Sequence, residues 1–217
     1  MKEKRVFGYF EVVFDTVYLC VVCLAGAWLL FNADTETGLL AGGMALILGI
    51  GDAFHLIPRI VAILTGKEDM LHRILGLGKL VASITMTVFY VLLWYMGRIF
   101  YLQGNDTPWT AIVYVLAILR IVLCFFPQNR WADRKQPVRW GIYRNIPFFL
   151  LGAVVTVFFW TYRTSVPELN LIWLAVTLSF VFYFPVVVWI HKSPKLGMLM
   201  FPKTCAYIWM ILMFLGI

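Results

Sequence analysis

The stretch LNLIWLAVTLSFVFYFPVVVWI, from Leu169 to Ile190, contains no charged side chain. Its 22 residues would form a helix about 33 Å long, which is enough to cross the hydrocarbon core of a bilayer. Inside a bilayer no water satisfies the backbone, so each peptide group must be bonded within the protein, and a helix does this by itself. This stretch therefore predicts a membrane-spanning helix.

Six further apolar stretches lie along the chain. They are Phe10–Phe31, Leu39–Leu64, Ile74–Tyr101, Trp109–Phe126, Ile142–Tyr162 and Leu196–Ile217. The whole chain of 217 residues is 62% hydrophobic and only 13% charged, whereas a soluble domain carries roughly a quarter charged residues. We therefore expect an all-α fold in which residues 1–217 form one domain, a polytopic bundle of seven transmembrane helices in the cell membrane.

Lysine and arginine residues predict the orientation of this bundle. Of the 18 Lys and Arg residues, 13 lie in the N-terminal segment or around the second, fourth and sixth connectors, and only Arg98 and Arg163 lie near the others. Short cytoplasmic connectors carry such an excess. We expect the N-terminus in the cytoplasm and the C-terminus outside. The net charge of +7 is explained first by topology, and no nucleic-acid partner is expected.

Ionisable residues also occur inside the spans, mostly in the predicted cytoplasmic half. Counted along the helices, Lys79, Asp52 and Asp15 lie about 8–10 Å inside the membrane, and Lys203 and Arg120 lie about 12–13 Å inside. Such groups cost several kcal/mol unless they are paired or hydrated, so they should face the bundle interior. Single pairs among them could be structural ion pairs, but the whole layer favours a functional site.

Helical spacing supports a shared polar cavity that is open to the cytoplasm. Asp52, His55 and Arg59 follow one helix face, as do Lys79, Ser83 and Thr87 on the next helix, because residues three or four apart are neighbours. The predicted catalytic residues are Asp52, His55 and Asp15. The predicted substrate-binding residues are Lys79, Arg120, Lys203, Glu11, Arg59, Ser83, Thr87, Tyr207 and His191.

The histidines and cysteines do not favour a cofactor. Asp52, His55 and His191 could supply three zinc ligands, but no HxxxH or HExxH motif is present, and a metal there is not favoured. Cys20 and Cys23 have the spacing of a redox motif within an apolar stretch that has no basic neighbour, so packing is the better interpretation. No cofactor is predicted.

Two glycine-rich segments carry a resemblance. Gly49-Ile-Gly51-Asp52 on one predicted span and Leu75-Gly-Leu-Gly78 at the start of the next resemble the bacterial lysoplasmalogenase-like membrane family, over about a sixth of the chain. The resemblance implies that Asp52 matches the family's first catalytic aspartate. This sequence departs from the family by having seven spans instead of eight and no late aspartate in a span. Asp15 or Glu11 would have to replace the second aspartate.

Three classes of function remain open. The first is binding, and hydrolysis, of an amphiphilic or lipid substrate, whose anionic headgroup suits the neutral-to-basic charge of the layer. The second is transport or conduction of a small anionic solute, proton-coupled through Asp15, Asp52 or His55. The third is a non-catalytic membrane sensor that uses the basic segment 130–144. We favour the first class, because the layer of ionisable residues lies only on the predicted cytoplasmic side of the membrane. The expected partners are membrane lipid and a small amphiphilic or anionic ligand. The sequence does not determine the oligomeric state.

Overall fold

The computed structural model describes residues 2–103 and 107–216, without the side chains of residues 2–6 and 194. All regular elements in these ranges are helices, and seven of them are long and apolar enough to cross a membrane. The predicted all-helical architecture with seven candidate spans is confirmed. The orientation stays a prediction, and the side chains of Lys2, Lys4 and Arg5, on which it partly depends, lie outside the described side chains.

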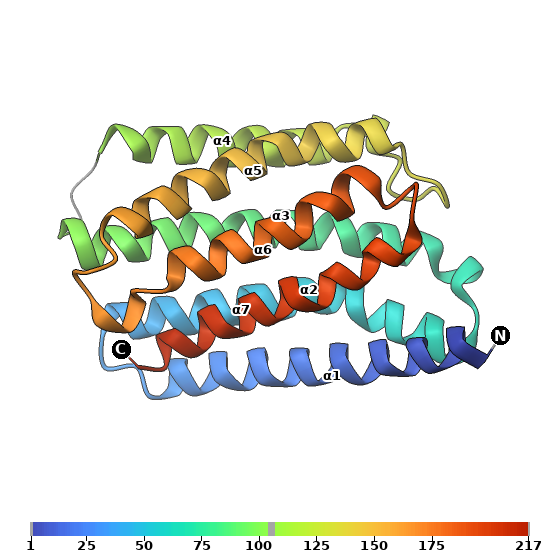
Figure 1. Ribbon diagram of the computed structural model, residues 1–217, viewed down its shortest axis with the longest axis horizontal. Coiled ribbons are helices and arrows are strands. Elements are labelled where there is room, and N and C mark those ends of the chain that lie inside the picture. Colours follow the sequence, from blue (N-terminus) through green and yellow to red (C-terminus); the bar gives the residue numbers. More distant parts are fainter. Residues whose placement is uncertain (1, 104–106, 217) are drawn as a thin grey trace.

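The helices follow one another through short connectors. Their bounds are α1 (Lys2–Phe31), α2 (Glu36–Thr65), α3 (Glu68–Leu102), α4 (Pro108–Phe125), α5 (Val138–Thr161), α6 (Ile172–Trp189) and α7 (Met200–Phe214). Three short 3₁₀ helices, η1 (Pro127–Asn129), η2 (Pro167–Leu169) and η3 (Pro194–Leu199), lie in the connectors. Consecutive helices run in opposite directions, so the two chain ends lie at opposite ends of the bundle (Figure 1).

Each helix packs against its neighbours in the sequence, and α1 also contacts α7. These contacts close the seven helices into a ring, which α2–α7 and α3–α5 contacts cross. The start of α1 and the α2–α3, α4–α5 and α6–α7 connectors share one end (Figure 1). We call it the basic end, because these segments and the helix ends that adjoin them carry 13 of the 18 Lys and Arg residues.

Glycines allow α2 and α3 to lie very close together. A Cβ atom on Gly78 would run into the carbonyl oxygen of Phe54, and one on Gly51 would run into the side chain of Thr85. Small residues at a helix interface allow this kind of backbone approach in membrane bundles. The glycine-rich segments that carried the family resemblance therefore have a direct packing role.

Some helix ends differ from the sequence prediction. α3 begins at Glu68, ahead of the predicted Ile74. Glu68 and Asp69 favour a helix start there, because acidic side chains suit the positive end of the helix dipole. The hydropathy pattern did not include them, because they are too polar for a membrane span. The last span was predicted from Leu196, but the chain first forms η3, and α7 begins at Met200. This start places Pro202 in the first turn of α7, where its missing N–H has no intrahelical partner to lose.

Aromatic and aliphatic side chains fill the interior, and Phe89, Leu93, Trp94 and Phe159 are fully buried. The outside of the bundle is also apolar, and Phe31, for example, is 90% exposed. A surface of this kind fits contact with lipid.

Candidate functional site

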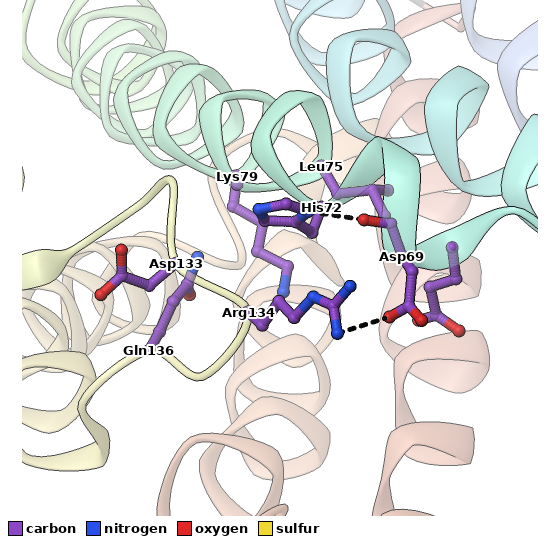
Figure 2. Close-up of a pocket in the computed structure, with 9 residues that line it drawn as sticks. Asp69, His72, Leu75, Lys79, Asp133, Arg134 and Gln136 are labelled. Carbon is purple, nitrogen blue, oxygen red and sulfur yellow. Dashed lines mark hydrogen bonds and ion pairs between the residues drawn. The ribbon is translucent and has the colours of Figure 1, made fainter.

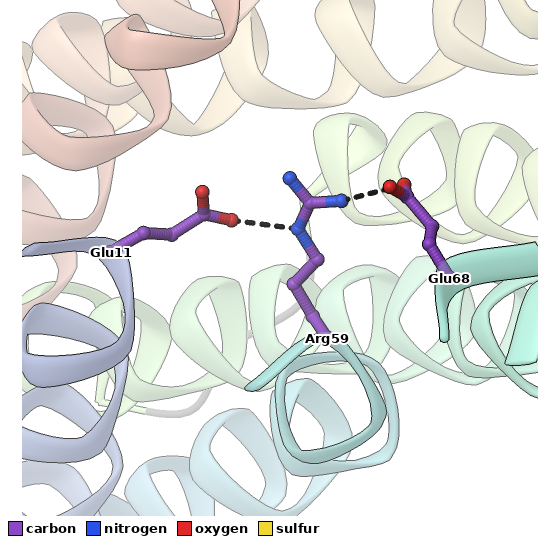
Figure 3. Close-up of polar contacts among 3 residues, drawn as sticks. All are labelled: Glu11, Arg59 and Glu68. Carbon is purple, nitrogen blue, oxygen red and sulfur yellow. Dashed lines mark hydrogen bonds and ion pairs between the residues drawn. The ribbon is translucent and has the colours of Figure 1, made fainter. Parts of the chain in front are cut away.

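Arg59 joins three helices at the basic end. Its Nε donates to Glu11 Oε1 at 2.7 Å, and its Nη1 donates to Glu68 Oε1 at 2.9 Å. Figure 3 shows the guanidinium of α2 held between carboxylates of α1 and α3. Two predicted substrate-binding residues, Glu11 and Arg59, are therefore bonded to each other. In this arrangement their first role is to hold α1, α2 and α3 together.

Deeper in the bundle, Asp52 on α2 is bonded to Tyr18 on α1. The Tyr18 hydroxyl donates to Asp52 Oδ2 at 2.6 Å, and the tyrosine side chain is almost fully buried. Asp15 lies one turn before Tyr18, is only 7% exposed, and has Glu11, Arg59 and Asp52 as electrostatic neighbours. The structure thus brings Asp15 and Asp52 together, as the sequence predicted. Tyr18 is not among the predicted site residues, although its spacing from Asp15 places it on the same helix face.

His55 does not join Asp52 in a catalytic pair. Both lie on the same face of α2, but the hydrogen bonds in the described ranges include none between them, and the buried Nδ1 of His55 has no partner there. The His55 side chain instead interacts with the backbone of Leu75 on α3, which Gly78 allows to lie close to α2. The aspartate has a tyrosine partner instead of a histidine.

Lys203 on α7 is 8% exposed and lies between aromatic rings. Its Nζ is 4.8 Å from the ring centroid of Tyr183 and 4.9 Å from that of Tyr207. Asp52 and Arg120 are its electrostatic neighbours. No ion pair within 4 Å involves Lys203 among the described residues. A lysine ammonium is attracted by aromatic faces, but these rings carry no compensating negative charge.

Arg120 on α4 is the most deeply buried cation of the predicted set, with 2% of its side chain exposed. Its guanidinium carbon lies 3.2 Å from the ring centroid of Phe148 on α5, and Cys124 is an electrostatic neighbour. Its Nε and Nη1 atoms are buried and have no hydrogen-bond partner in the described ranges. Both atoms are donors, so this site lacks an acceptor.

A group of polar side chains surrounds the two buried cations. The Tyr90 hydroxyl is 3.1 Å from Ser179 Oγ and donates to the Tyr207 hydroxyl at 3.4 Å. The Tyr183 hydroxyl donates to Asn145 Oδ1 at 3.2 Å. Of these residues only Tyr207 was predicted as a site residue. Ser179 and Tyr183 are four apart in an otherwise apolar span, and that spacing is the signal that could have identified them.

Several predicted residues make no hydrogen bond to this group within the described ranges. Ser83 and Thr87 donate to carbonyl groups of their own helix, at Lys79 and Ser83 respectively. His191 is exposed in the turn that follows α6. A cluster of three or more His, Cys, Asp or Glu residues able to hold a metal ion is absent from the described ranges.

Lys79 lines a separate pocket at the basic end, with a volume of about 260 Å³. Its walls come from the start of α3 and from the α4–α5 connector (Figure 2). The sequence predicted one cavity that all the polar residues of the layer would line. Among the predicted residues, Lys79 is the one that this pocket includes.

The site therefore consists of two charged poles. Asp15 and Asp52 lie on α1 and α2, Arg120 and Lys203 lie on α4 and α7, and Asp52 and Lys203 are electrostatic neighbours across the bundle.

No protein-family model, curated protein or solved structure matches the chain.

Proposed function

We propose that this protein binds the anionic headgroup of a membrane amphiphile inside the basic half of the bundle, and that Arg120 and Lys203 hold that headgroup. The observation that carries the proposal is Arg120, whose buried Nε and Nη1 have no acceptor among the described residues. Phosphate and carboxylate oxygens are the acceptors that a guanidinium fits best, often through two parallel bonds.

The energetics favour a missing ligand over a purely structural role. A buried charge costs several kcal/mol when no partner offsets its desolvation. Phe148 covers one face of the Arg120 guanidinium, and a cation–π contact contributes about 0.5–2 kcal/mol, which does not compensate fully. Lys203 adds a second positive charge beside it. A bound anion would neutralise this pole.

The far half of the bundle supports a closed site over a conduit. Beyond Tyr90 the interior is filled by Leu93, Trp94 and Phe159, all fully buried. Near that end the described ranges hold the buried residues Thr110 and Arg98 and the buried hydroxyl groups of Tyr101 and Thr107. Thr110 accepts a hydrogen bond from the Trp94 indole. A pathway for an anionic solute would need polar groups along its whole length.

Hydrolysis of the bound amphiphile is the second candidate function, and one observation favours it. Asp52 accepts the Tyr18 hydroxyl through Oδ2, and its other oxygen has no hydrogen bond within the described ranges. A carboxylate with one oxygen fixed and one free can orient and deprotonate a water molecule. Lys203, the electrostatic neighbour of Asp52, would then stabilise negative charge that develops on the substrate.

The test uses the purified full chain in detergent with two single-chain probes, 1-oleoyl lysophosphatidate and the neutral 1-oleoyl glycerol. We expect wild type to bind the anionic probe at least tenfold more tightly, as measured by native mass spectrometry. Arg120→Gln should lose this preference, and Arg139→Gln, which removes an exposed charge from the same half of the bundle, should keep it. Equal affinity of wild type for both probes would refute the proposal.

Two further measurements separate folding and chemistry from binding. Without ligand, Arg120→Gln should unfold at the same temperature as wild type or higher, because it removes an uncompensated buried charge. Incubation with lysophosphatidate, followed by mass spectrometry of the products, tests hydrolysis. Turnover that disappears in Asp52→Asn would support catalysis, whereas binding without turnover would support the sensor alternative.

A further inference from the structure

The pocket at the basic end is a second candidate site, separate from Arg120 and Lys203. It is lined by Glu68, Asp69, His72, Leu75, Gly76, Lys79, Asp133, Arg134 and Gln136. Pockets for drug-sized ligands usually measure about 300–1,000 Å³. At about 260 Å³, this pocket fits a headgroup or another small polar group.

The two walls of the pocket are held together by backbone contacts. A Cβ atom on Gly76 would run into the carbonyl oxygen of Trp131, so the α4–α5 connector lies directly against α3. The Gln136 amide donates to the same carbonyl at 3.2 Å, and the Trp131 indole donates to the carbonyl of Cys124 at 2.8 Å. The connector is therefore fixed in place, and the pocket is a formed feature of the fold.

Every acidic side chain of the pocket already lies beside a cation, although Glu68 shares Arg59 with Glu11. The pairs are Glu68 with Arg59 at 2.9 Å, Asp69 with Arg134 at 3.4 Å, and Asp133 with Arg130 at 4.0 Å. The Nδ1 atom of His72 lies 2.7 Å from the carbonyl oxygen of Asp69. Although three of the lining residues are acidic, little negative charge is left for a further cation.

Lys79 is the exception among the basic residues. Its ammonium makes no hydrogen bond and no ion pair within the described ranges. Its electrostatic neighbours are the cations Arg59 and Arg144 and one carboxylate, Glu68, which is already bonded to Arg59. Figure 2 shows the Lys79 side chain extending from α3 toward Arg134 of the connector. Lys79 is therefore the lining cation that no carboxylate pairs within the described ranges.

We propose that this pocket binds a phosphate group, with Lys79 as its main cation and Arg134 as a second donor. Lysine binds phosphate as a point charge and arginine through its planar fork. The phosphate could belong to a lipid headgroup, since the pocket lies at the end of the bundle where basic connectors gather, or to a soluble phosphate ester. Both sources offer the same chemistry, and the experiment separates them.

The experiment measures two phosphate probes on the full chain. Glycerol 3-phosphate is titrated into the detergent-solubilised protein by calorimetry. Dioleoylphosphatidate is tested in phosphatidylcholine nanodiscs, with the rise in unfolding temperature as the readout. Both titrations are repeated in the Arg120→Gln background, so that the interior site proposed above does not contribute. Binding of the soluble probe identifies a phosphate-ester site, and binding of the lipid alone identifies a headgroup site.

Lys79→Gln should weaken the binding of whichever probe binds by at least tenfold, and Lys79→Arg should restore most of the affinity. Lys195→Gln, which removes an exposed lysine outside the pocket, should bind as wild type does. The inference is overturned if neither probe binds, or if Lys79→Gln binds as tightly as the Lys195→Gln control. Since the readout does not depend on Arg120, failure here leaves the proposed function standing.

Discussion

The bond between Tyr18 and Asp52 is the contact through which α1 fixes the candidate catalytic carboxylate, and it can be measured directly. Tyr18→Phe keeps the ring and removes only the hydroxyl, which lies 2.6 Å from Asp52 Oδ2. A hydrogen bond to a charged group contributes about 1.5–3 kcal/mol. We expect a loss of about 2 kcal/mol in the free energy of unfolding, or roughly a 30-fold change in the unfolding equilibrium constant.

A double-mutant cycle isolates this bond from other effects of each substitution. Tyr18→Phe, Asp52→Asn and the double variant are unfolded by dodecyl sulfate in mixed micelles, and tryptophan fluorescence reports the transition. The coupling energy should be about 1.5–3 kcal/mol. Tyr9→Phe, on the same helix at a position that is 60% exposed, should change stability little. A coupling energy below about 0.5 kcal/mol would show that Tyr18 does not hold the carboxylate.

Two further predictions concern packing and the ion-pair group at the basic end. Gly78→Ala should destabilise the protein by about 1–3 kcal/mol, because its Cβ meets the backbone carbonyl of Phe54. Gly43→Ala, which adds a Cβ where no neighbouring atom lies within 4 Å, should be neutral or stabilising in the same unfolding assay. Equal stability of the two variants would contradict this packing role of Gly78. Arg59→Gln should lower the free energy of unfolding by about 1 kcal/mol at low salt and by less at high salt, because the two ion pairs of Arg59 are partly exposed. A loss of stability that does not depend on salt would argue against an electrostatic role.

Periodicity and hydropathy predicted the helices well because a long apolar stretch can bond all of its backbone groups within itself only as a helix. Of the stretch from Leu169 to Ile190, Ile172–Trp189 became α6, and Leu169 became the last residue of η2, the 3₁₀ turn that begins at Pro167. Boundaries at the basic end were less predictable. There, charged residues such as Glu68 continue a helix beyond its apolar stretch, where hydropathy no longer marks it.

The candidate site was predicted only in part. Asp15, Asp52, Arg120 and Lys203 do lie inside the bundle, because ionisable groups on a span avoid lipid. Their partners could not be predicted, since a pattern along one helix says nothing about which side chain another helix brings opposite to it. Tyr18 facing Asp52 is the clearest example.

The amino-acid sequence by itself determined the seven candidate spans of the described residues and the gathering of most of their ionisable residues in one half, because composition and helical period depend only on local chemistry. The tertiary structure alone decided how those charges are divided. Helix packing paired Arg59 with Glu11 and Glu68, gave Asp52 a tyrosine, and left Arg120 without an acceptor among the described residues. Whether a buried charge is compensated depends on neighbours distant in sequence, and those are set only when the helices close into a ring.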